Sequence, residues 1–408
     1  MPHDPYKALY LHIPFCVKRC GYCDFATSAV ERDSPVIDEY VESLVLQLRR
    51  ASKEGKLGQI ETVYLGGGTP SHIGMGRLSM LLYALSTAMH LTPEVECTME
   101  ANPESLTEAM VRDIWALGVN RLSIGVQSFD DEVLRILGRA HDAEAARAAV
   151  RAAQTRFRNV SVDLMGGIPG QSLASFEASV REALALGVTH VSVYPLAIEP
   201  HTPFDRAVMR GEMAEPDDDA EAACMEAAAR ILGQAGFIRY EVASYARPGL
   251  ASRHNTSYWT GAPYLGIGRS AVTMTQKEMR RMRVQDGQVV DDLDARQMAA
   301  EDLMLGMRRA AGVSDAQVAQ AARAIDGTRG AGGLGADGSG LANGGARAID
   351  GAHAAGALGI MGGGSVAAAF DELAALGLAR HVGGRWRPTE RGWLCGNELY
   401  GRLLDLAP

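Results

Sequence analysis

The sequence is poor in cysteine and has no long hydrophobic run. Only 6 of its 408 residues are cysteine, which is too few for a scaffold held together by disulfides. No segment reaches the roughly 18 uninterrupted apolar residues that a membrane-spanning helix needs. The start of the chain, MPHDPYKALY, has neither the basic nor the apolar region of a secretory signal. From these absences we expect a cytoplasmic protein.

The chain also lacks an excess of positive charge. Its 40 lysines and arginines are outnumbered by 49 aspartates and glutamates, for a formal net charge of -9 at pH 7. This balance argues against a protein that coats nucleic acid, so we expect no nucleic-acid partner. Hydrophobic residues make up 47% of the chain and charged residues 22%, as in typical globular proteins, and the length is enough for more than one domain.

Glycine is in excess, and the excess lies in one segment. Residues 327–364 contain 15 glycines and 9 alanines. Such a segment has few side chains whose burial could offset the loss of chain entropy on folding. We therefore expect a flexible insertion over residues 314–364, without a function of its own.

Strand-like apolar runs alternate with helix-like amphipathic segments in the first part of the chain. The strand candidates are residues 9–13, 62–65, 94–99, 121–126, 161–164 and 190–193. This alternation predicts an α/β fold with a parallel sheet. The pattern alone leaves an open doubly wound sheet and an incomplete barrel as alternatives, and both place their site at the carboxyl ends of the strands.

The alternation stops near residue 245, which predicts a domain boundary. We expect the α/β domain over residues 1–245, a loop-rich second region over 246–313, the insertion over 314–364 and a C-terminal cap over 365–408. The cap has the pattern of a helix, a short hairpin and a closing helix. It therefore predicts a smaller α+β domain that is winged-helix-like.

Half of the cysteines lie in one short loop, directly after the first predicted strand. The segment FCVKRCGYCDF has the spacing C-x3-C-x2-C, formed by Cys16, Cys20 and Cys23. Three thiolates can hold a 4Fe-4S cluster and leave one iron open for a ligand. A zinc knuckle and a redox pair are the alternatives. A closed zinc site needs four ligands, and no second closely spaced pair exists among Cys97, Cys224 and Cys395, so the spacing favours the cluster.

With its flanking motifs, this loop resembles the signature of radical S-adenosylmethionine proteins. The motifs YLHIPFCVKRCGYCDF, YLGGGTPS, MEANPE, NRLSIGVQSFDDEVLRILGRAH, DLMGGIPGQ and HVSVYPLAIEPHTPF occur in this order. Together they resemble the HemN/HemW group of that class, whose members handle porphyrin and heme. The resemblance runs from Tyr10 to about Gly312 and implies an incomplete (β/α)6 barrel.

Polar and glycine residues follow the predicted strands, where such barrels build their sites. Taken alone, each polar residue is better explained as a surface or capping residue, and the glycines as an ordinary turn. The resemblance implies that a set of them contacts S-adenosylmethionine, because glycines admit a ligand to the backbone and carboxylates and amides suit its hydroxyl and amino-acid groups. This set is Tyr10, Gly67, Gly68, Thr69, Glu100, Gln127, Arg139 and Asp163, with Tyr22 flanking the adenine.

Two functions of the group compete for this chain. One is a heme chaperone, which binds heme and delivers it to apoproteins; the other is an oxygen-independent coproporphyrinogen III oxidase or another porphyrin-directed enzyme. Oxidase relatives carry a further cysteine where this chain has Phe25, and a long N-terminal extension, whereas here the first strand starts near Leu9. We therefore expect the chaperone, without coproporphyrinogen oxidase activity.

The second region contains RHNTSYW, which resembles the HNxxYW motif of the chaperones. An imidazole can ligate heme iron, and aromatic rings can pack on a porphyrin face. We therefore predict His254 as the heme ligand, beside Tyr258 and Trp259; a histidine packed in a core is the alternative. Relatives often carry a histidine where this chain has Val272, which puts any role of that position in doubt.

The resemblance thus implies three cofactors: a 4Fe-4S cluster, S-adenosylmethionine and heme. The implied partners are heme and the apoproteins that accept it. Whether S-adenosylmethionine is cleaved, whether the chain forms a homodimer and whether acceptor proteins bring it into peripheral contact with a membrane are left open by the sequence.

Overall fold

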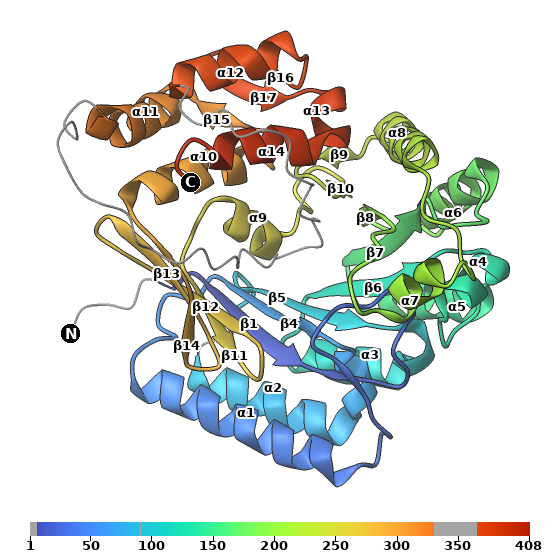
Figure 1. Cartoon of the computed structure of the whole chain (residues 1–408). Coiled ribbons are helices and arrows are strands. Elements are labelled where there is room, and N and C mark those ends of the chain that lie inside the picture. Colours follow the sequence, from blue (N-terminus) through green and yellow to red (C-terminus); the bar gives the residue numbers. More distant parts are fainter. Residues whose placement is uncertain (1–5, 90, 330–364) are drawn as a thin grey trace. The chain divides into compact units, whose positions relative to one another are not determined.

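The computed structural model describes residues 6–89, 91–329 and 365–408 (Figure 1). The chain forms two compact units, which we describe separately. Unit 1 consists of Met1–Arg239, Ala243–His254 and Pro263–Thr273, and unit 2 of Tyr240–Val242, Asn255–Ala262 and Met274–Pro408. Among the described residues, no helix is both long and apolar enough to span a membrane.

Unit 1 is built on a parallel sheet with the strand order β1-β4-β5-β6-β7-β8. These strands are β1 (Ala8–Ile13), β4 (Thr62–Gly67), β5 (Glu96–Ala101), β6 (Arg121–Gln127), β7 (Asn159–Gly166) and β8 (His190–Pro195). All neighbouring pairs are parallel. Each predicted strand overlaps one of them, and the predicted incomplete (β/α)6 barrel is confirmed. β11 (Tyr264–Ile267) adds a parallel strand beside β1, and β10 (Ser244–Ala246) pairs antiparallel with β8.

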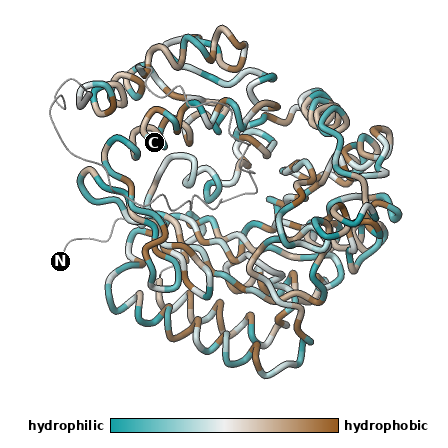
Figure 2. The backbone as a smooth tube through the Cα atoms, viewed as in Figure 1, coloured by the Kyte–Doolittle hydropathy of each residue, from teal (hydrophilic) through white to brown (hydrophobic). Residues whose placement is uncertain are grey.

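Helices follow the strands and cover the outer face of the sheet. They are α1 (Pro35–Lys53), α2 (Met75–Ala88), α3 (Glu108–Ala116), α4 (Asp131–Leu137), α5 (Ala143–Gln154), α6 (Leu173–Ala185), α7 (Pro203–Met209) and α8 (Asp218–Gln234). Side chains of Thr107, Asp130, Asp142 and Ser172 cap the first turns of α3 to α6 by accepting from backbone N–H groups. Hydrophobic and hydrophilic residues alternate along α1 and α2 in Figure 2, because one face of each helix is buried.

The inner face of the barrel is polar, in contrast to the outer face. Successive side chains of a strand point to opposite sides. In β1, Leu9 and Leu11 join the hydrophobic core, whereas Tyr10 and His12 bond to each other. In β4 the alternation continues with buried Val63 and Leu65. The sheet therefore presents a set of polar side chains to its interior, and these build the site described below.

Unit 2 contains a winged-helix-like arrangement. Its elements follow in the order α10 (Ala295–Met307), β15 (Val313–Ser314), α11 (Asp315–Arg329), α12 (Val366–Ala375), β16 (Ala379–His381) and β17 (Arg385–Pro388), with the sheet order β15-β17-β16. The closing helices are α13 (Glu390–Leu394) and α14 (Gly396–Leu404). The predicted helix, hairpin and closing helix of the cap are all present. The unit also includes an antiparallel hairpin of β13 (Arg280–Gln285) and β14 (Gln288–Leu293).

The domain boundaries differ from the predicted ones at two places. First, residues 315–329 of the expected insertion form α11, and Ile325 on this helix is 0% exposed in the core of unit 2. Residues 315–329 are rich in alanine, which favours a helix. The glycine content of the rest of residues 314–364 conceals this preference when the composition of the whole segment is considered. The rest of that prediction, residues 330–364, lies outside the described residues. Second, unit 1 extends past residue 245, because β11 completes its sheet beside β1.

Candidate functional site

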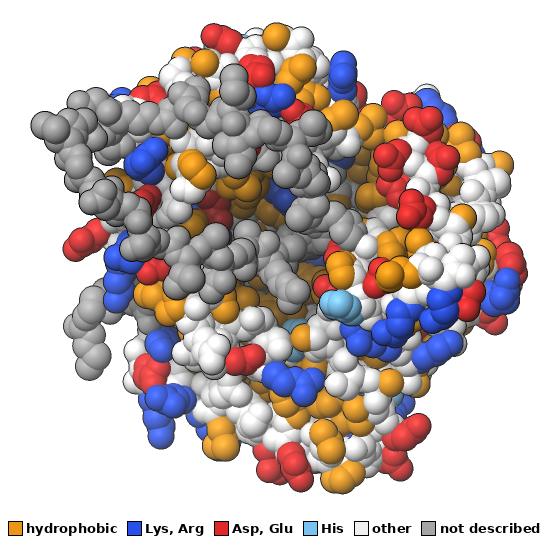
Figure 3. All heavy atoms as spheres, viewed as in Figure 1, with side chains coloured by type: hydrophobic (Ala, Val, Ile, Leu, Met, Phe, Trp, Pro, Cys, Tyr) orange, Lys and Arg blue, Asp and Glu red, His pale blue; other side chains and the backbone are white. Residues whose placement is uncertain are grey.

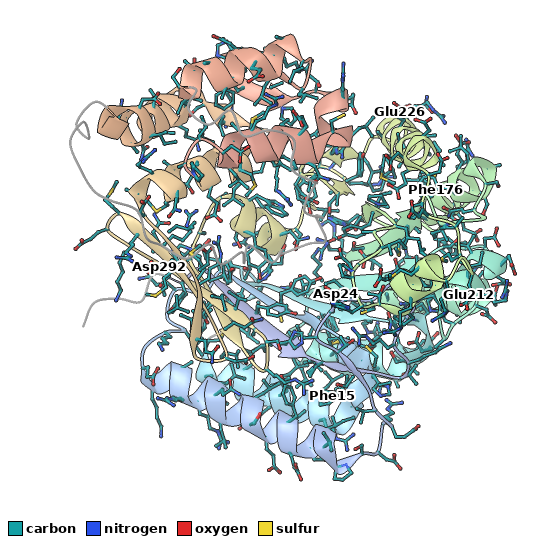
Figure 4. The ribbon with its side chains drawn as sticks, viewed as in Figure 1. Phe15, Asp24, Phe176, Glu212, Glu226 and Asp292 are labelled. Atoms are coloured by element: carbon teal, nitrogen blue, oxygen red, sulfur yellow. The ribbon has the colours of Figure 1, made fainter. Side chains whose placement is uncertain are left out.

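The loop after β1 carries the three clustered cysteines, and it is tied down at both ends. β2 (Phe15–Cys16) pairs with β3 (Ser28–Ala29), which closes the loop; Phe15 and Asp24 are labelled in Figure 4. Gly21 donates to the Leu137 carbonyl at 3.3 Å, and Phe204 on α7 donates to the Gly21 carbonyl at 3.0 Å. A Cβ at Gly21 would lie 2.1 Å from the Phe204 ring. Glycine at position 21, between Cys20 and Cys23, therefore lets the loop pack against Phe204 of α7.

Each thiol of the loop has a polar neighbour. Thr69 Oγ1 donates to Cys16 Sγ at 3.4 Å, Arg139 Nη1 donates to Cys20 Sγ at 3.4 Å, and Cys23 Sγ lies 3.8 Å from Thr27 Oγ1. Burial raises the pKa of Cys16 to about 11, against the opposing effect of the Thr69 hydrogen bond. The free thiol is therefore neutral at pH 7. Metal coordination is the interaction that deprotonates such a group.

The donor set fits an iron-sulfur cluster better than a single metal ion. All six cysteines are described, and all are free. Within the described part of the chain, no three His, Cys, Asp or Glu side chains lie close enough together to hold one ion. A four-iron cluster instead takes its thiolates on separate irons, and hydrogen bonds to sulfur, such as those from Thr69 and Arg139, tune its potential. The three thiols would hold three irons and leave the fourth open.

The outer side of this loop is charged. Lys18 and Arg19 are exposed, and Arg19 Nη2 donates to the Cys23 carbonyl at 3.0 Å. Lys and Arg side chains gather on the face that carries α7 (Figure 3). Phe25 is also exposed, at 63% of its surface. It lies two residues after the last cysteine and has no group that could bind iron.

The three glycines at the end of β4 are each required for a different reason. A Cβ at Gly66 would lie 2.7 Å from the Tyr64 ring and 2.8 Å from the Glu100 carboxyl carbon. Gly67 has φ +107°, which L side chains rarely adopt, and its Cβ would meet the His12 ring at 2.4 Å. A Cβ at Gly68 would lie 2.7 Å from the backbone of Ile13. The protein's own groups therefore lie where each Cβ would be, and approach of a ligand to this turn stays a prediction.

Glu100, at the carboxyl end of β5, is held from two directions. Tyr64 Oη donates to Glu100 Oε1 at 2.7 Å, and the backbone N–H of Gly67 donates to Glu100 Oε2 at 3.0 Å. The carboxylate therefore has a fixed orientation inside the barrel. Tyr10 Oη lies 3.0 Å from His12 Nδ1, and His12 Nε2 donates to the Ala26 carbonyl at 3.2 Å. His12 thereby links the inner face of β1 to the cysteine loop.

Arg139 connects the cysteine loop to two strand ends. Its Nη2 donates to Asn102 Oδ1 and to the Gly125 carbonyl, both at 2.7 Å. Asn102 Nδ2 in turn donates to Thr69 Oγ1 at 2.9 Å. Arg139 Nη1 also lies 3.5 Å from Tyr22 Oη, and burial raises the pKa of that phenol. The guanidinium therefore places one fixed positive charge beside Cys20.

Gln127, at the end of β6, has a strained backbone. Its φ is +66°, and the N–H of Ser128 donates to the Val126 carbonyl at 2.8 Å, which makes a γ-turn of the rare left-handed type. His141 Nε2 donates to the same carbonyl at 3.1 Å, and its Nδ1 lies 3.3 Å from Glu104 Oε2. Strain of this kind occurs where the surroundings enforce it, often at functional sites. His141, two residues after Arg139, is not among the residues predicted from the sequence.

Asp163 faces the barrel interior from β7. Ser123 Oγ donates to its Oδ1 at 3.4 Å. Removal from water raises the pKa of Asp163 to about 6, against the opposing attraction of the Arg121 guanidinium. The carboxyl therefore changes its protonation state in a range that many assays cover. With Glu100 and Gln127, it places amide and carboxylate groups on three neighbouring strands of the inner face.

The structure brings most of the predicted residues together and connects His254 to them through the ring of Tyr64. The predicted contact set lies at the carboxyl edge of the sheet or faces the interior below it. His254 instead sits at the amino end of β4, where its Nδ1 lies 2.9 Å from Thr62 Oγ1. It is 1% exposed, and burial lowers its pKa to about 3. Heme ligation by His254 stays a prediction; in the described conformation the ring is buried and its Nδ1 is engaged by Thr62.

The fold and the cysteine loop define a radical S-adenosylmethionine protein, and residues 10–183 match the Radical SAM superfamily. The chain is 35% identical to heme chaperone HemW of Synechocystis, over 76% of this chain and 80% of that protein. It is 42% identical to heme chaperone HemW of Mycobacterium tuberculosis, over 66% of this chain and 70% of that protein. The chain therefore belongs to the HemW family.

A solved structure supports the same fold. Coproporphyrinogen III oxidase (HemN) from Escherichia coli superimposes with a TM-score of 0.73, over 99% of this chain and 91% of that one. The sequence identity is 20%, so this likeness concerns the fold alone. The predicted fold class and the predicted family are thus both confirmed.

Proposed function

We propose that this protein is a heme chaperone: it binds heme, holds a 4Fe-4S cluster with S-adenosylmethionine on its open iron, and delivers heme to apoproteins. The observation that carries the proposal is the similarity to proteins named heme chaperone HemW, at 35% identity over 80% of one of them and 42% over 70% of another. Sequence similarity over so much of both chains is stronger support for a shared activity than likeness of fold alone would be.

The cofactor part of the proposal assigns roles to the residues at the carboxyl edge of the sheet. Cys16, Cys20 and Cys23 would hold the cluster. Glu100, Gln127 and Asp163 would bind polar groups of S-adenosylmethionine, and Arg139 would hold the loop against the strand ends. When bound, S-adenosylmethionine supplies radical chemistry; the protein supplies binding, orientation and electrostatics. Tyr10, Tyr22, Gly67, Gly68 and Thr69 complete the proposed contact set.

The alternative function is an oxygen-independent coproporphyrinogen III oxidase. The resemblance noted above places a further cysteine of the oxidases at the position of Phe25. Here an apolar side chain is exposed at 63% of its surface, and it can neither ligate iron nor donate a proton. The fold likeness to HemN, at 20% identity, favours no particular activity. Phe25 therefore supports the chaperone.

The heme part of the proposal does not depend on His254. That imidazole is buried and its Nδ1 is bonded to Thr62, so heme binding and ligation by His254 need separate tests. The proposed partners are heme and the apoproteins that accept it. Homodimer formation and peripheral contact with a membrane through acceptor proteins belong to the same proposal and need their own measurements.

One experiment on a single anaerobically reconstituted sample tests the function. Heme is titrated and followed by its Soret band, the loaded protein is mixed with an apo-acceptor, and coproporphyrinogen turnover is assayed in parallel. We expect saturable heme binding and transfer without formation of protoporphyrinogen. Steady turnover would instead establish the oxidase. The Cys16→Ala variant tests whether transfer needs the cluster, and Cys395→Ala, which removes an exposed thiol, is its matched control.

A further inference from the structure

Tyr64 occupies a central position on the inner face of the barrel. Its hydroxyl donates to Glu100 Oε1 at 2.7 Å, while the other carboxylate oxygen accepts from the Gly67 N–H. Burial, followed by the nearby charge of Glu100, raises the pKa of Tyr64 well above its ordinary value. The phenol therefore keeps its proton and serves as a permanent donor to the carboxylate.

The Tyr64 ring is part of a stack of three rings. The His254 ring lies 5.0 Å from it at an interplanar angle of 28°, and the Tyr10 ring lies 6.2 Å from it at 26°. Offset stacking at such distances is favourable. Because Gly66 has no side chain, the Tyr64 ring and the Glu100 carboxyl group can occupy the space that a Cβ would fill.

His254 is itself held firmly. Its Nδ1 bonds Thr62 Oγ1 at 2.9 Å. The buried carboxylate of Glu96 accepts from the backbone N–H groups of Arg253 and His254, each at 2.9 Å. The histidine is thus fixed through both its ring and its backbone. A fixed, uncharged ring can hold the neighbouring phenol in one rotamer.

We propose that His254 and Tyr64 are positioning residues for Glu100: the His254 ring holds Tyr64, and Tyr64 orients the carboxylate for S-adenosylmethionine. The inference rests on the proposed S-adenosylmethionine site. It assigns the histidine of the HNTSYW segment to that site rather than to heme iron. The juxtaposition that carries it is a continuous path from Thr62 through His254 and Tyr64 to Glu100, in which each contact is a hydrogen bond or a ring stack.

The test uses the full chain after anaerobic reconstitution. Three readouts are taken: S-adenosylmethionine affinity by calorimetry, the paramagnetic resonance of the reduced cluster with and without S-adenosylmethionine, and the Soret band of bound heme. Tyr64→Phe keeps the ring stack and removes the hydrogen bond to the carboxylate. We expect it to weaken S-adenosylmethionine binding about 10-fold or more, with iron and sulfide content unchanged, because the lost bond is to a charged group.

The His254 variants separate positioning from heme ligation. We expect His254→Ala to weaken S-adenosylmethionine binding about 3-fold to 10-fold, in keeping with the loss of an aromatic pair. His254→Phe restores the stack and should recover most of that affinity. The Soret band should be unchanged in both variants. His190→Ala is the matched control, since it also removes a buried imidazole from the barrel, but one that bonds Ser161 on β7; we expect it to leave the affinity unchanged.

Each outcome decides between the hypotheses. A shifted Soret band in His254→Ala with unaltered S-adenosylmethionine affinity would overturn the inference and restore His254 as a heme ligand. Wild-type affinity in both Tyr64→Phe and His254→Ala would also overturn it. If the wild-type protein bound no S-adenosylmethionine, the proposed cofactor site itself would fall, and the inference with it. If His254→Ala failed to fold, Tyr64→Phe and His254→Phe would still decide.

Discussion

Gly68→Ala tests how closely the turn after β4 is packed against the cysteine loop. A Cβ at position 68 would lie 2.7 Å from the Ile13 carbonyl oxygen, 2.7 Å from the Phe15 nitrogen and 2.8 Å from the Phe15 oxygen. All three contacts are with backbone atoms, so no side chain can rotate away. The backbone that leads into Cys16 must shift instead. The same segments are joined by hydrogen bonds from Gly68 and Thr69 to these two carbonyls, at 2.9 and 2.8 Å.

The expected cost follows from overpacking. One extra methyl group in a filled site destabilises by about 1 to 3 kcal/mol. Local opening of β1 and β4 should therefore become roughly 5-fold to 150-fold more frequent, at about 1.4 kcal/mol per factor of ten. The displaced loop should also lose its 4Fe-4S cluster, because the three cysteine thiolates must be placed correctly to ligate three irons of one cluster.

Hydrogen exchange measured by mass spectrometry over residues 8–16 and 62–69 of the cluster-free protein is the assay, followed by iron and sulfide analysis after reconstitution. Gly76→Ala is the matched control, because a Cβ there has nothing within 4 Å and alanine suits the helix α2, with a gain of up to about 1 kcal/mol. Wild-type exchange and full iron content in Gly68→Ala would refute the packing argument.

Three further predictions follow from the site and from unit 2. Alanine in place of Cys16, Cys20 or Cys23 should abolish the iron and sulfide content of the reconstituted protein, whereas Cys395→Ala should retain it. One zinc per chain in the wild type would contradict the cluster assignment. Because burial raises the pKa of Asp163 to about 6, the folded state binds this proton more tightly than the unfolded chain does, so stability decreases as the pH rises from about 4 through 6. Asp163→Asn should therefore be more stable than wild type at pH 8, by at most about 3 kcal/mol, and no more stable at pH 4, as measured by urea unfolding; an equal difference at both pH values would show that the carboxyl is not perturbed. A short Gly/Ser linker in place of residues 330–364 should leave heme binding unchanged. Ile325→Asp should destabilise unit 2 by several kcal/mol, because it places a charge in the core. Thermal unfolding and heme titration of both variants test these two expectations.

Local patterns were sufficient to predict the order of the elements. The six strands and the helices between them follow from apolar periodicity, which depends on residues a few positions apart. The cysteine spacing likewise lies within one loop, and the glycines of β4 stand at a strand end that the alternation locates. The wrong prediction at α11 has the same origin: this helix of 15 residues directly precedes the Gly/Ala-rich segment, and no composition change separates its alanines from that segment.

The sequence by itself determined the parallel α/β fold, the cysteine loop, and the family to which the chain belongs, because each of these is recorded in short segments read in order. Only the tertiary structure decided what each site residue touches. His254 and Thr62 are 192 positions apart in the chain and meet at 2.9 Å, and Tyr64 reaches Glu100 across 36 positions. Such partners depend on which strands are neighbours and on which side of the sheet each residue faces. That information arises only when the strands assemble and bury the inner face of the sheet, which is why the neighbours of His254 could not be predicted from its motif.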